Sequence, residues 1–355
     1  MWRRALGWGA ALTLAALIAG PSAGAGAAPH ARGLPASRLV VGGAVGAPHS
    51  YSLAQLRRLP QTTLNTYQPP GTRPGTHLEQ GVSLEDLVDI SQPKLPGAKN
   101  ALLRVTVAVT GRSGLGSSFA LGELDPSFGN HPALLVLRQD GASLKDAPEL
   151  LVPGDHTAGR FVRHVTRVTV AVDSPGPSAP PSPGAVTVHE GSRTTVPYRS
   201  RLAELPSQTL TVSFGGPTGA QQHTESGPAL NTVLAAGGIS PRAVTWVAAV
   251  GSDGYVATVT PEESLIGGRP LLLSTHEDGA ALSQPRLVAD GDVKGGRYVS
   301  DVVDLMVGRI PPPRRLIPTC ARDAGATVNV AHAGSLTNLV RSASRPRSCP
   351  RAGRS

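Results

Sequence analysis

The chain has 355 residues, of which 16% are charged and 3% aromatic, and it is rich in glycine (42) and proline (33). Its formal net charge is +9, but residues 1–33 contribute +3 and residues 311–355 contribute +7, which leaves −1 for residues 34–310. A nucleic-acid-binding domain concentrates lysine and arginine on its own surface, so the nearly neutral body excludes that class. The length accommodates two domains, and the glycine and proline content favours short strands joined by turns.

The first 28 residues have the layout of an export signal. Trp2-Arg3-Arg4 is a short basic segment, Ala5–Gly20 is an apolar run of small residues, and Pro21–Ala28 ends in the small residues typical of a cleavage site. The run is shorter than the roughly 20 strongly apolar residues of a spanning helix, and no later segment is apolar enough. We expect a signal peptide over residues 1–28 and an extracytoplasmic mature protein (secreted, periplasmic or in the cell envelope) without a membrane span.

The next stretch, residues 38–173, alternates strand, helix and turn signals. Apolar residues at helical spacing, with a serine cap before them or a proline after them, mark short helices, and apolar runs bounded by turn residues mark strands. The predicted elements are a strand at 37–46, a helix at 51–59, a strand at 62–66, a loop at 68–75, a helix at 81–88 capped by Ser83, and strands at 101–109 and 134–137 before a turn at Asp140-Gly141.

A proline-rich stretch divides the chain. Residues 174–183 can form neither helix nor sheet ladder, so they are predicted to be an extended linker. Beyond it, residues 184–310 repeat the order of residues 38–173, which we interpret as an α+β fold made of two copies of one module. The corresponding stretches are 51–60 and 198–206, 81–84 and 227–230, 109–114 and 250–255, 131–136 and 269–273, and 159–160 and 296–297.

The stretches that close both copies carry a candidate anion site. Residues 153–170 and 290–307 share Gly-Asp, then Gly-Arg-aromatic-Val, then a valine-rich run. A guanidinium and the backbone N–H groups of a glycine turn can hold a phosphate or a pterin. The alternative is structural, with each arginine paired to a neighbouring aspartate and the aromatic residue packed in the core. The candidate ligand-binding residues are Arg160, Gly295, Gly296 and Arg297.

Asp253-Gly254-Tyr255 is a second candidate. Its tyrosine hydroxyl would face a pocket, or its glycine would supply the positive φ of an ordinary turn before a strand. Histidines such as His131 and His223 are scattered without His-x-x-x-His spacing, and no serine lies in a Gly-x-Ser-x-Gly context. We therefore predict neither a metal site nor a catalytic residue from local motifs.

The order of these motifs resembles the molybdopterin-binding domain of sulfite-oxidase-type oxidoreductases. That order is a short helix ending in Leu-Pro, a Gly-Val-x-Leu-x-x-Leu helix, a strand before Asp-Gly-Tyr, a Pro-Leu-Leu-Leu strand with Asp-Gly, and a closing Gly-x-Arg-x-Val segment. Residues 184–310 match best, through 253–255 and 292–302, and residues 38–173 match more loosely. The resemblance implies two mixed, β-rich sulfite-oxidase-like modules in tandem and, in catalytic members, a molybdopterin cofactor.

Catalytic members bind molybdenum through a cysteine thiolate, and this chain departs from them there. Its two cysteines, Cys320 and Cys349, both lie in the C-terminal tail. A soft metal centre favours a thiolate ligand. The resemblance thus implies a scaffold without the residue on which the chemistry relies most, and the sequence leaves the cofactor unknown.

The tail, residues 311–355, carries a short second resemblance. Val328–Val340 is similar to the opening strand and helix of periplasmic molybdate/tungstate-binding proteins, in which a Gly-Ser at a helix N-terminus helps to bind the oxyanion. This makes His332 and Ser335 an oxyanion-binding remnant. The match is far shorter than the roughly 40 residues a domain needs to hold a core. We expect a linker followed by a truncated or frame-shifted fragment, mostly disordered; the alternative is a disordered tail that matches by chance.

Three functions remain open. The preferred hypothesis is an exported, non-catalytic relative of the molybdopterin oxidoreductases that binds a small anionic or pterin ligand. The second is a working oxidoreductase whose cofactor is held without cysteine, and the third is a structural or protein-binding tandem domain of the cell envelope. The sequence leaves the oligomeric state open.

Overall fold

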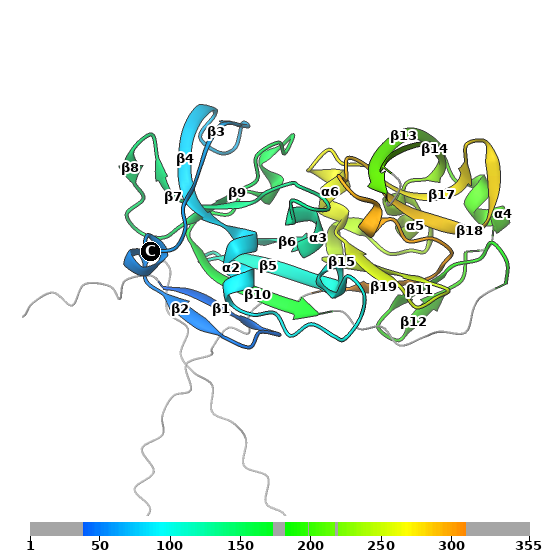
Figure 1. The fold of residues 1–355 in the computed structure, drawn as a ribbon, viewed down its shortest axis with the longest axis horizontal. Coiled ribbons are helices and arrows are strands. Elements are labelled where there is room, and N and C mark those ends of the chain that lie inside the picture. Colours follow the sequence, from blue (N-terminus) through cyan, green and yellow to red (C-terminus); the bar gives the residue numbers. More distant parts are fainter. Residues whose placement is uncertain (1–37, 173–181, 198, 217–218, 310–355) are drawn as a thin grey trace, which may run out of the picture. The chain divides into compact units, whose positions relative to one another are not determined.

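The structure is a computed structural model, and it describes residues 38–172, 182–197, 199–216 and 219–309. The predicted signal peptide, most of the predicted linker at 174–183, and the tail with His332 and Ser335 lie outside the described residues. Strands dominate, with short helices between them (Figure 1), so the prediction of a β-rich mixed fold is confirmed. Among the described residues, no helix is long and apolar enough to cross a bilayer.

We call residues 38–172 the first half and residues 182–309 the second half. The elements of the first half are β1 (Leu39–Gly43), β2 (His49–Tyr51), α1 (Leu53–Leu56), β3 (Thr62–Gln68), β4 (Gly75–Ser83), α2 (Leu84–Ile90), η1 (Ala101–Arg104), β5 (Val105–Gly111), β6 (Gly116–Ala120), α3 (Leu121–Leu124), β7 (Leu134–Gln139), β8 (Ala142–Ser143), β9 (Glu149–Leu151), η2 (Ala158–Arg160) and β10 (Val165–Val172).

The second half follows a similar succession. Its elements are β11 (Thr187–Glu190), β12 (Arg193–Thr195), α4 (Arg199–Glu204), β13 (Ser207–Gly216), β14 (Gly219–Pro228), α5 (Leu230–Ala236), η3 (Pro241–Ala243), β15 (Trp246–Gly251), β16 (Val256–Val259), α6 (Pro261–Leu265), β17 (Leu271–Glu277), β18 (Ala280–Ala289), η4 (Gly295–Arg297) and β19 (Val302–Gly308).

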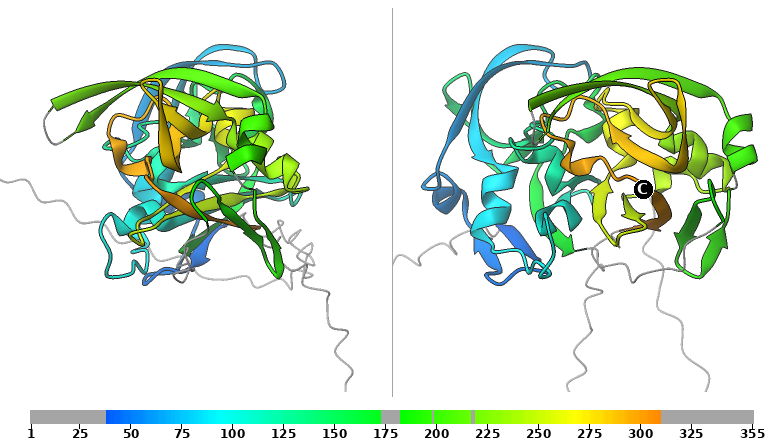
Figure 2. Two further views of the ribbon diagram at one scale, coloured as in Figure 1. Left: turned by 90° about the vertical axis from the view of Figure 1, so that its right-hand side faces the viewer. Right: turned by 45° about the vertical axis from the view of Figure 1, so that its right-hand side comes forward.

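Each half contains a five-stranded sheet with the same strand order. The first is β2-β1-β10-β5-β6 and the second is β12-β11-β19-β15-β16. In each sheet one pair is parallel (β1 with β10, β11 with β19) and the other pairs are antiparallel. Each half also has an antiparallel sheet built on a long hairpin: β3-β4-β7-β8, with β9 also paired to β7, and β13-β14-β17-β18. The β13–β14 hairpin extends outward from its half (Figure 2).

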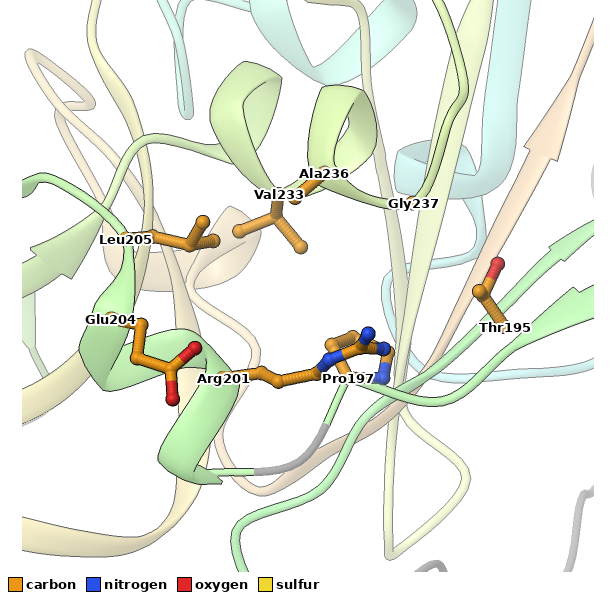
Figure 3. A pocket seen from close by; sticks show the side chains of 8 residues that line it. All are labelled: Thr195, Pro197, Arg201, Glu204, Leu205, Val233, Ala236 and Gly237. Carbon is orange, nitrogen blue, oxygen red and sulfur yellow. The ribbon is translucent and has the colours of Figure 1, made fainter.

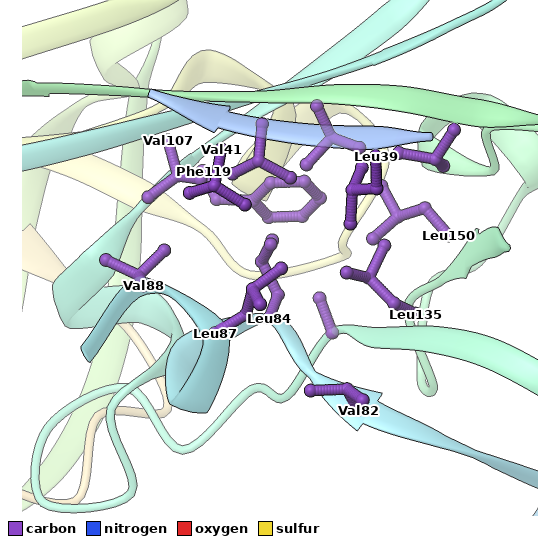
Figure 4. Close-up of a cluster of buried hydrophobic side chains, with 14 of the residues drawn as sticks. Leu39, Val41, Val82, Leu84, Leu87, Val88, Val107, Phe119, Leu135 and Leu150 are labelled. Carbon is purple, nitrogen blue, oxygen red and sulfur yellow. The ribbon is translucent and has the colours of Figure 1, made fainter. Parts of the chain in front are cut away.

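Helix α2 shows how the core forms locally. Its apolar residues Leu84, Leu87 and Val88 recur at the spacing of one helix face, and all three are fully buried beneath β1 (Figure 4). Ser83 caps the helix, because its hydroxyl accepts a hydrogen bond from the Asp86 N–H at 3.5 Å. The predicted capped helix is confirmed.

The core of the second half uses side chains from the first. Leu103 is buried within it, and Leu102 and Phe128 pack against it. Backbone bonds cross between the halves in both directions: the Val293 N–H donates to the Phe128 carbonyl at 2.6 Å, and the His156 N–H donates to the Ile266 carbonyl at 3.1 Å. The described residues accordingly belong to one compact unit.

Two local predictions were wrong. The stretch 101–109 was predicted as one strand, but it opens with the tight turn η1 before β5 begins at Val105. The long hairpin strand β4 was missed between Gly75 and Gln80. The outer part of this hairpin alternates half-buried and exposed residues that are nearly all polar, so the sequence lacks the apolar period that marks a strand.

Two glycines allow the hairpin strands to approach β7 and β17. A Cβ on Gly81 would lie 2.0 Å from the Leu135 carbonyl oxygen, and one on Gly227 would lie 2.3 Å from that of Leu273. We predict that Gly81→Ala and Gly227→Ala each lower the free energy of unfolding by about 1–3 kcal/mol, measured by urea denaturation. Gly97→Ala is the control, since its Cβ would meet nothing within 4 Å. A loss no larger than that of the control would contradict the close approach.

Candidate functional site

The two candidate arginines occupy matching places in the fold. Arg160 ends η2 and Arg297 ends η4, and each of these turns precedes the strand that pairs in parallel in its five-stranded sheet. Both side chains are fully buried. A buried guanidinium requires compensating carboxylates, so their partners decide what these residues can do.

The guanidinium of Arg160 is paired with two carboxylates. Its Nε and Nη2 donate to Asp155 at 3.0 and 2.5 Å, and its Nη1 donates to Glu123 at 2.6 Å. The His131 ring lies 3.1 Å from Glu123 and 3.7 Å from Asp155. Burial disfavours the charged form of Glu123, but Arg160 and His131 outweigh burial and lower the pKa of this carboxyl to about 2. The group is therefore a charged, hydrogen-bonded cluster.

Arg297 repeats the arrangement in the second half. Its Nε and Nη2 donate to Asp292 at 2.9 and 2.5 Å, and its Nη1 donates to Glu263 at 2.7 Å. Arg269 takes the place that His131 has in the first half, with its Nη2 3.1 Å from Asp292. Its Nη1 crosses to the first half and donates to the Gly129 carbonyl at 2.7 Å.

These contacts favour the structural alternative over the anion-clamp role predicted for Arg160 and Arg297, which stays a prediction. All three nitrogens of each guanidinium already donate to carboxylates inside the protein. Clamping a ligand would break a buried ion pair, which costs about 3–5 kcal/mol. The two arginines therefore fill the structural role that the sequence had left as the alternative.

The other candidate residues gather around a cavity of about 340 Å³. They come from the turn before β16 and from η4, which are separated in sequence, and residues of the first half complete the wall. The lining residues are Lys99, Asn100, Ser252, Asp253, Tyr255, Gly295, Gly296, Tyr298, Ser300 and Asp301.

Tyr255 ties this cavity together across the two halves. Its hydroxyl donates to the Gly296 carbonyl at 2.6 Å and accepts from Asn100 Nδ2 at 2.9 Å. Asn100 has a left-handed backbone, with φ of 51°, a conformation that asparagine tolerates better than most residues. Burial raises the pKa of Tyr255 although Asn100 opposes the shift, so the tyrosine is a neutral phenol at neutral pH.

A second cavity of about 570 Å³ adjoins the first and shares Asn100, Gly295 and Gly296 with it. It adds the aromatic rings of Phe128 and Phe214 and the charged group of Lys294. The Phe214 ring packs on Tyr298 with centroids 4.4 Å apart. We call the two cavities together the interhalf cleft. The cleft combines the ammonium groups of Lys99 and Lys294, the carboxylates of Asp253 and Asp301, polar side chains and aromatic rings.

The sequence did not point to Lys99, Asn100, Phe128, Phe214 or Lys294. Lys99, Asn100 and Phe128 belong to the first half, whereas the predicted candidates of the cleft belong to the second half. Only the tertiary fold brings the two sets together. The first half offers no matching tyrosine at the turn before β6, where Leu115 stands with 75% of its surface exposed. Within the described ranges, no cluster of three or more histidine, cysteine, aspartate or glutamate side chains is placed to hold a metal ion.

A third cavity, of about 190 Å³, lies between α4 and α5 (Figure 3). None of the candidate residues reaches it. Its lining is Thr195, Pro197, Arg201, Glu204, Leu205, Val233, Ala236 and Gly237. It is smaller than the interhalf cleft and carries no combination of donors drawn from both halves.

A cysteine-ligated molybdenum centre does not fit the residues of the cleft. The side chains that line it offer nitrogen, oxygen and aromatic carbon atoms, and residues 38–309 contain no cysteine. The soft ligand that such a centre favours is thus absent from this part of the chain.

Comparisons with known proteins give a distant likeness. No protein-family model and no curated protein matches the chain. Among solved structures it is similar to the sulfane dehydrogenase SoxCD from Paracoccus pantotrophus, with 15% sequence identity and a TM-score of 0.30 over 75% of this chain and 77% of that chain. A likeness this distant assigns no activity to the chain.

We predict a large loss of stability when the side chain of Arg297 is replaced by an uncharged one. Arg297→Met leaves Glu263 and Asp292 buried without their main partner and is expected to cost about 3–5 kcal/mol in the free energy of unfolding. Arg309→Met is the control, because that arginine is 55% exposed in its pair with Glu190 and should cost less than about 1 kcal/mol. Chemical denaturation measures both. Equal losses would contradict the closed cluster.

Glu262 predicts how stability depends on pH. Its Oε2 accepts from the Ser117 hydroxyl and from the Ser118 N–H at 3.2 Å, across the two halves. Burial raises its pKa, with Ser117 and Ser118 opposing. The folded state then binds a proton more readily than the unfolded state, so this carboxyl adds stability as pH falls from its folded pKa towards its unfolded pKa of about 4.3. We expect Glu262→Gln to remove that gain, measured by urea titrations from pH 7 down to about pH 4, which includes the unfolded pKa. An unchanged slope would contradict the assignment.

Proposed function

We propose that the chain is an exported, non-catalytic relative of the sulfite-oxidase-type proteins. In this proposal two copies of one module enclose the interhalf cleft, which binds a small anionic or pterin-like ligand without cysteine-ligated molybdenum. The observation that carries the proposal is the cleft itself, where Tyr255, Gly295 and Gly296 meet Lys99 and Lys294.

Repeated side-chain pairs support the duplication. The buried Arg–Asp–Glu cluster occurs once in each half. The hairpin sheets carry a matching exposed pair: His77 Nδ1 lies 2.7 Å from Asp140, and His223 Nδ1 lies 3.0 Å from Asp278. Both aspartates open an Asp-Gly turn with positive φ. Two unrelated domains would not be expected to repeat both the strand order and these pairs.

The chemistry of the cleft supports the ligand class. Lys99 and Lys294 are exposed at its walls, and an ammonium group attracts phosphate, carboxylate or oxyanion groups as a point charge. Phe128 and Phe214 line the cleft with aromatic carbon, against which a flat ring can pack. Asn100 has its amide N–H engaged with Tyr255, which leaves its carbonyl oxygen to accept from a ring N–H of the ligand.

Thermal unfolding with two probes tests the proposal. Tungstate represents the oxyanion and pterin-6-carboxylate the pterin. A probe at about 100 times its Kd should raise the Tm by roughly 5 °C or more, because binding to the native state alone stabilises it. A Lys99→Ala, Lys294→Ala double variant should lose most of the shift, whereas Lys145→Ala, which removes an exposed charge outside the cleft, should keep it.

Metal analysis of the exported protein separates the alternatives. We expect far less than one molybdenum per chain. Stoichiometric molybdenum would favour the working oxidoreductase instead. No shift in Tm with either probe would overturn the small-ligand proposal.

A further inference from the structure

Strand β13 has an open edge that runs towards the interhalf cleft. It is ten residues long and forms the first strand of its sheet, with β14 as its sheet neighbour. The side chains of Thr209, Thr211 and Ser213 are exposed, polar and uncharged. The hairpin to which it belongs extends outward (Figure 2), which leaves this edge accessible along most of its length.

The register shows which backbone groups face outward. The Asp278 N–H donates to the Thr224 carbonyl at 2.8 Å, so the backbone of Thr224 is directed away from β13. Thr211 pairs with Thr224, and opposite residues of an antiparallel ladder direct their N–H and C=O groups either both towards each other or both away. Thr211 therefore directs its groups outward, and by alternation so do Thr209 and Ser213.

This edge already accepts a strand at one end. The Gly215 N–H donates to the Val293 carbonyl at 2.7 Å, and Gly215 forms a parallel bridge with Lys294. Gly215 belongs to the same alternating set as Thr211 and Ser213. For Thr209, Thr211 and Ser213, the described part of the chain provides no comparable second strand.

The opposite edge of the same sheet is protected, and β13 is not. Strand β18 contains Pro285 and Arg286, and its pairing with β17 shifts register near His276. Proline, charge and irregular pairing are the features that keep edge strands from associating. Residues 207–216 contain no proline and no charged residue, so this edge presents an uncharged template for another strand.

We propose that β13 binds an extended peptide of a partner protein as an added parallel strand, with a carboxylate at the peptide's C-terminal end beside Lys294. The direction follows from the segment at Lys294, which bridges β13 in parallel. A parallel peptide laid on Thr209–Ser213 ends where β13 reaches the cleft, and Lys294 lines the cleft there beside Phe214 and Gly215; Lys99 lines the adjoining cavity. Backbone bonds supply the affinity in this mode of recognition, and the ammonium groups select the carboxylate. The peptide site adjoins the cleft without requiring a small ligand in it.

Fluorescence polarisation of the full chain tests this proposal. The probe is a fluorescein-labelled heptapeptide of alternating valine and threonine with a free carboxyl terminus, compared with its C-terminally amidated form. We expect amidation to weaken binding about tenfold or more, and Lys294→Ala to remove the difference between the two forms. Equal binding of both forms to the unmodified chain would overturn the role of the carboxylate.

A proline substitution at the edge provides a second, independent test. Thr211→Pro removes one outward N–H and leaves the ladder with β14 in place, so peptide binding should fall at least about tenfold; Thr211→Val, which keeps that N–H, should bind like the unmodified chain. Sedimentation velocity tests the alternative occupant of this edge, a second copy of the chain, because it measures the oligomeric state. A dimer that Thr211→Pro abolishes, together with no peptide binding, would assign the edge to a second copy of the chain and overturn the peptide proposal. Should Thr211→Pro fail to fold, the comparison of free and amidated peptide still decides.

Discussion

The pairing of two buried arginines with carboxylates is the constraint on which the rest of this structure depends. Arg160 and Arg297 lie in the turns before β10 and β19. Each pairs with an aspartate of its own segment and with a glutamate of a short helix. Removing one partner from such a group costs far more than a surface pair does. The sheet, the helix and the turn are therefore held in one relative position, and the cleft inherits its shape from them.

The same contacts explain why the cleft lies between the halves. The loop after α3 reaches η4 through the Phe128 carbonyl, and the loop after α6 reaches the first half through the Ile266 carbonyl. Each half thus donates one backbone N–H to the other and accepts one from it. The halves differ at the turn before the edge strand, where Tyr255 stands in the second half and Leu115 in the first. The Tyr255 hydroxyl bonds to both halves, whereas Leu115 is exposed.

Local sequence signals predicted the elements that local physics determines. The helix capped by Ser83 and the strand beginning at Leu134 follow from capping and apolar runs, and the fold class follows from their number. The sequence did not predict the outer parts of the hairpins, because their exposed strands lack an apolar period. At the site, Tyr255, Gly295 and Gly296 came from sequence motifs, whereas Lys99 and Phe128 did not, since no pattern near them refers to the other half. The sequence paired Arg160 with Arg297 by motif, but it could not show that both side chains are buried among carboxylates.

The internal neutralisation of the arginines also bears on the missing thiolate. If the only counter-charge of a buried guanidinium were an anionic cofactor, its charge would be unpaired whenever the cofactor was absent. An unpaired buried charge costs several kcal/mol. Here Asp155 and Glu123, or Asp292 and Glu263, already satisfy that charge. The charge of each buried arginine is therefore balanced without any added ligand. At the cleft, Tyr255 and Asn100 hold the two halves together, whereas Lys99, Lys294 and the open edge of β13 take no part in the arginine clusters and stay available for binding.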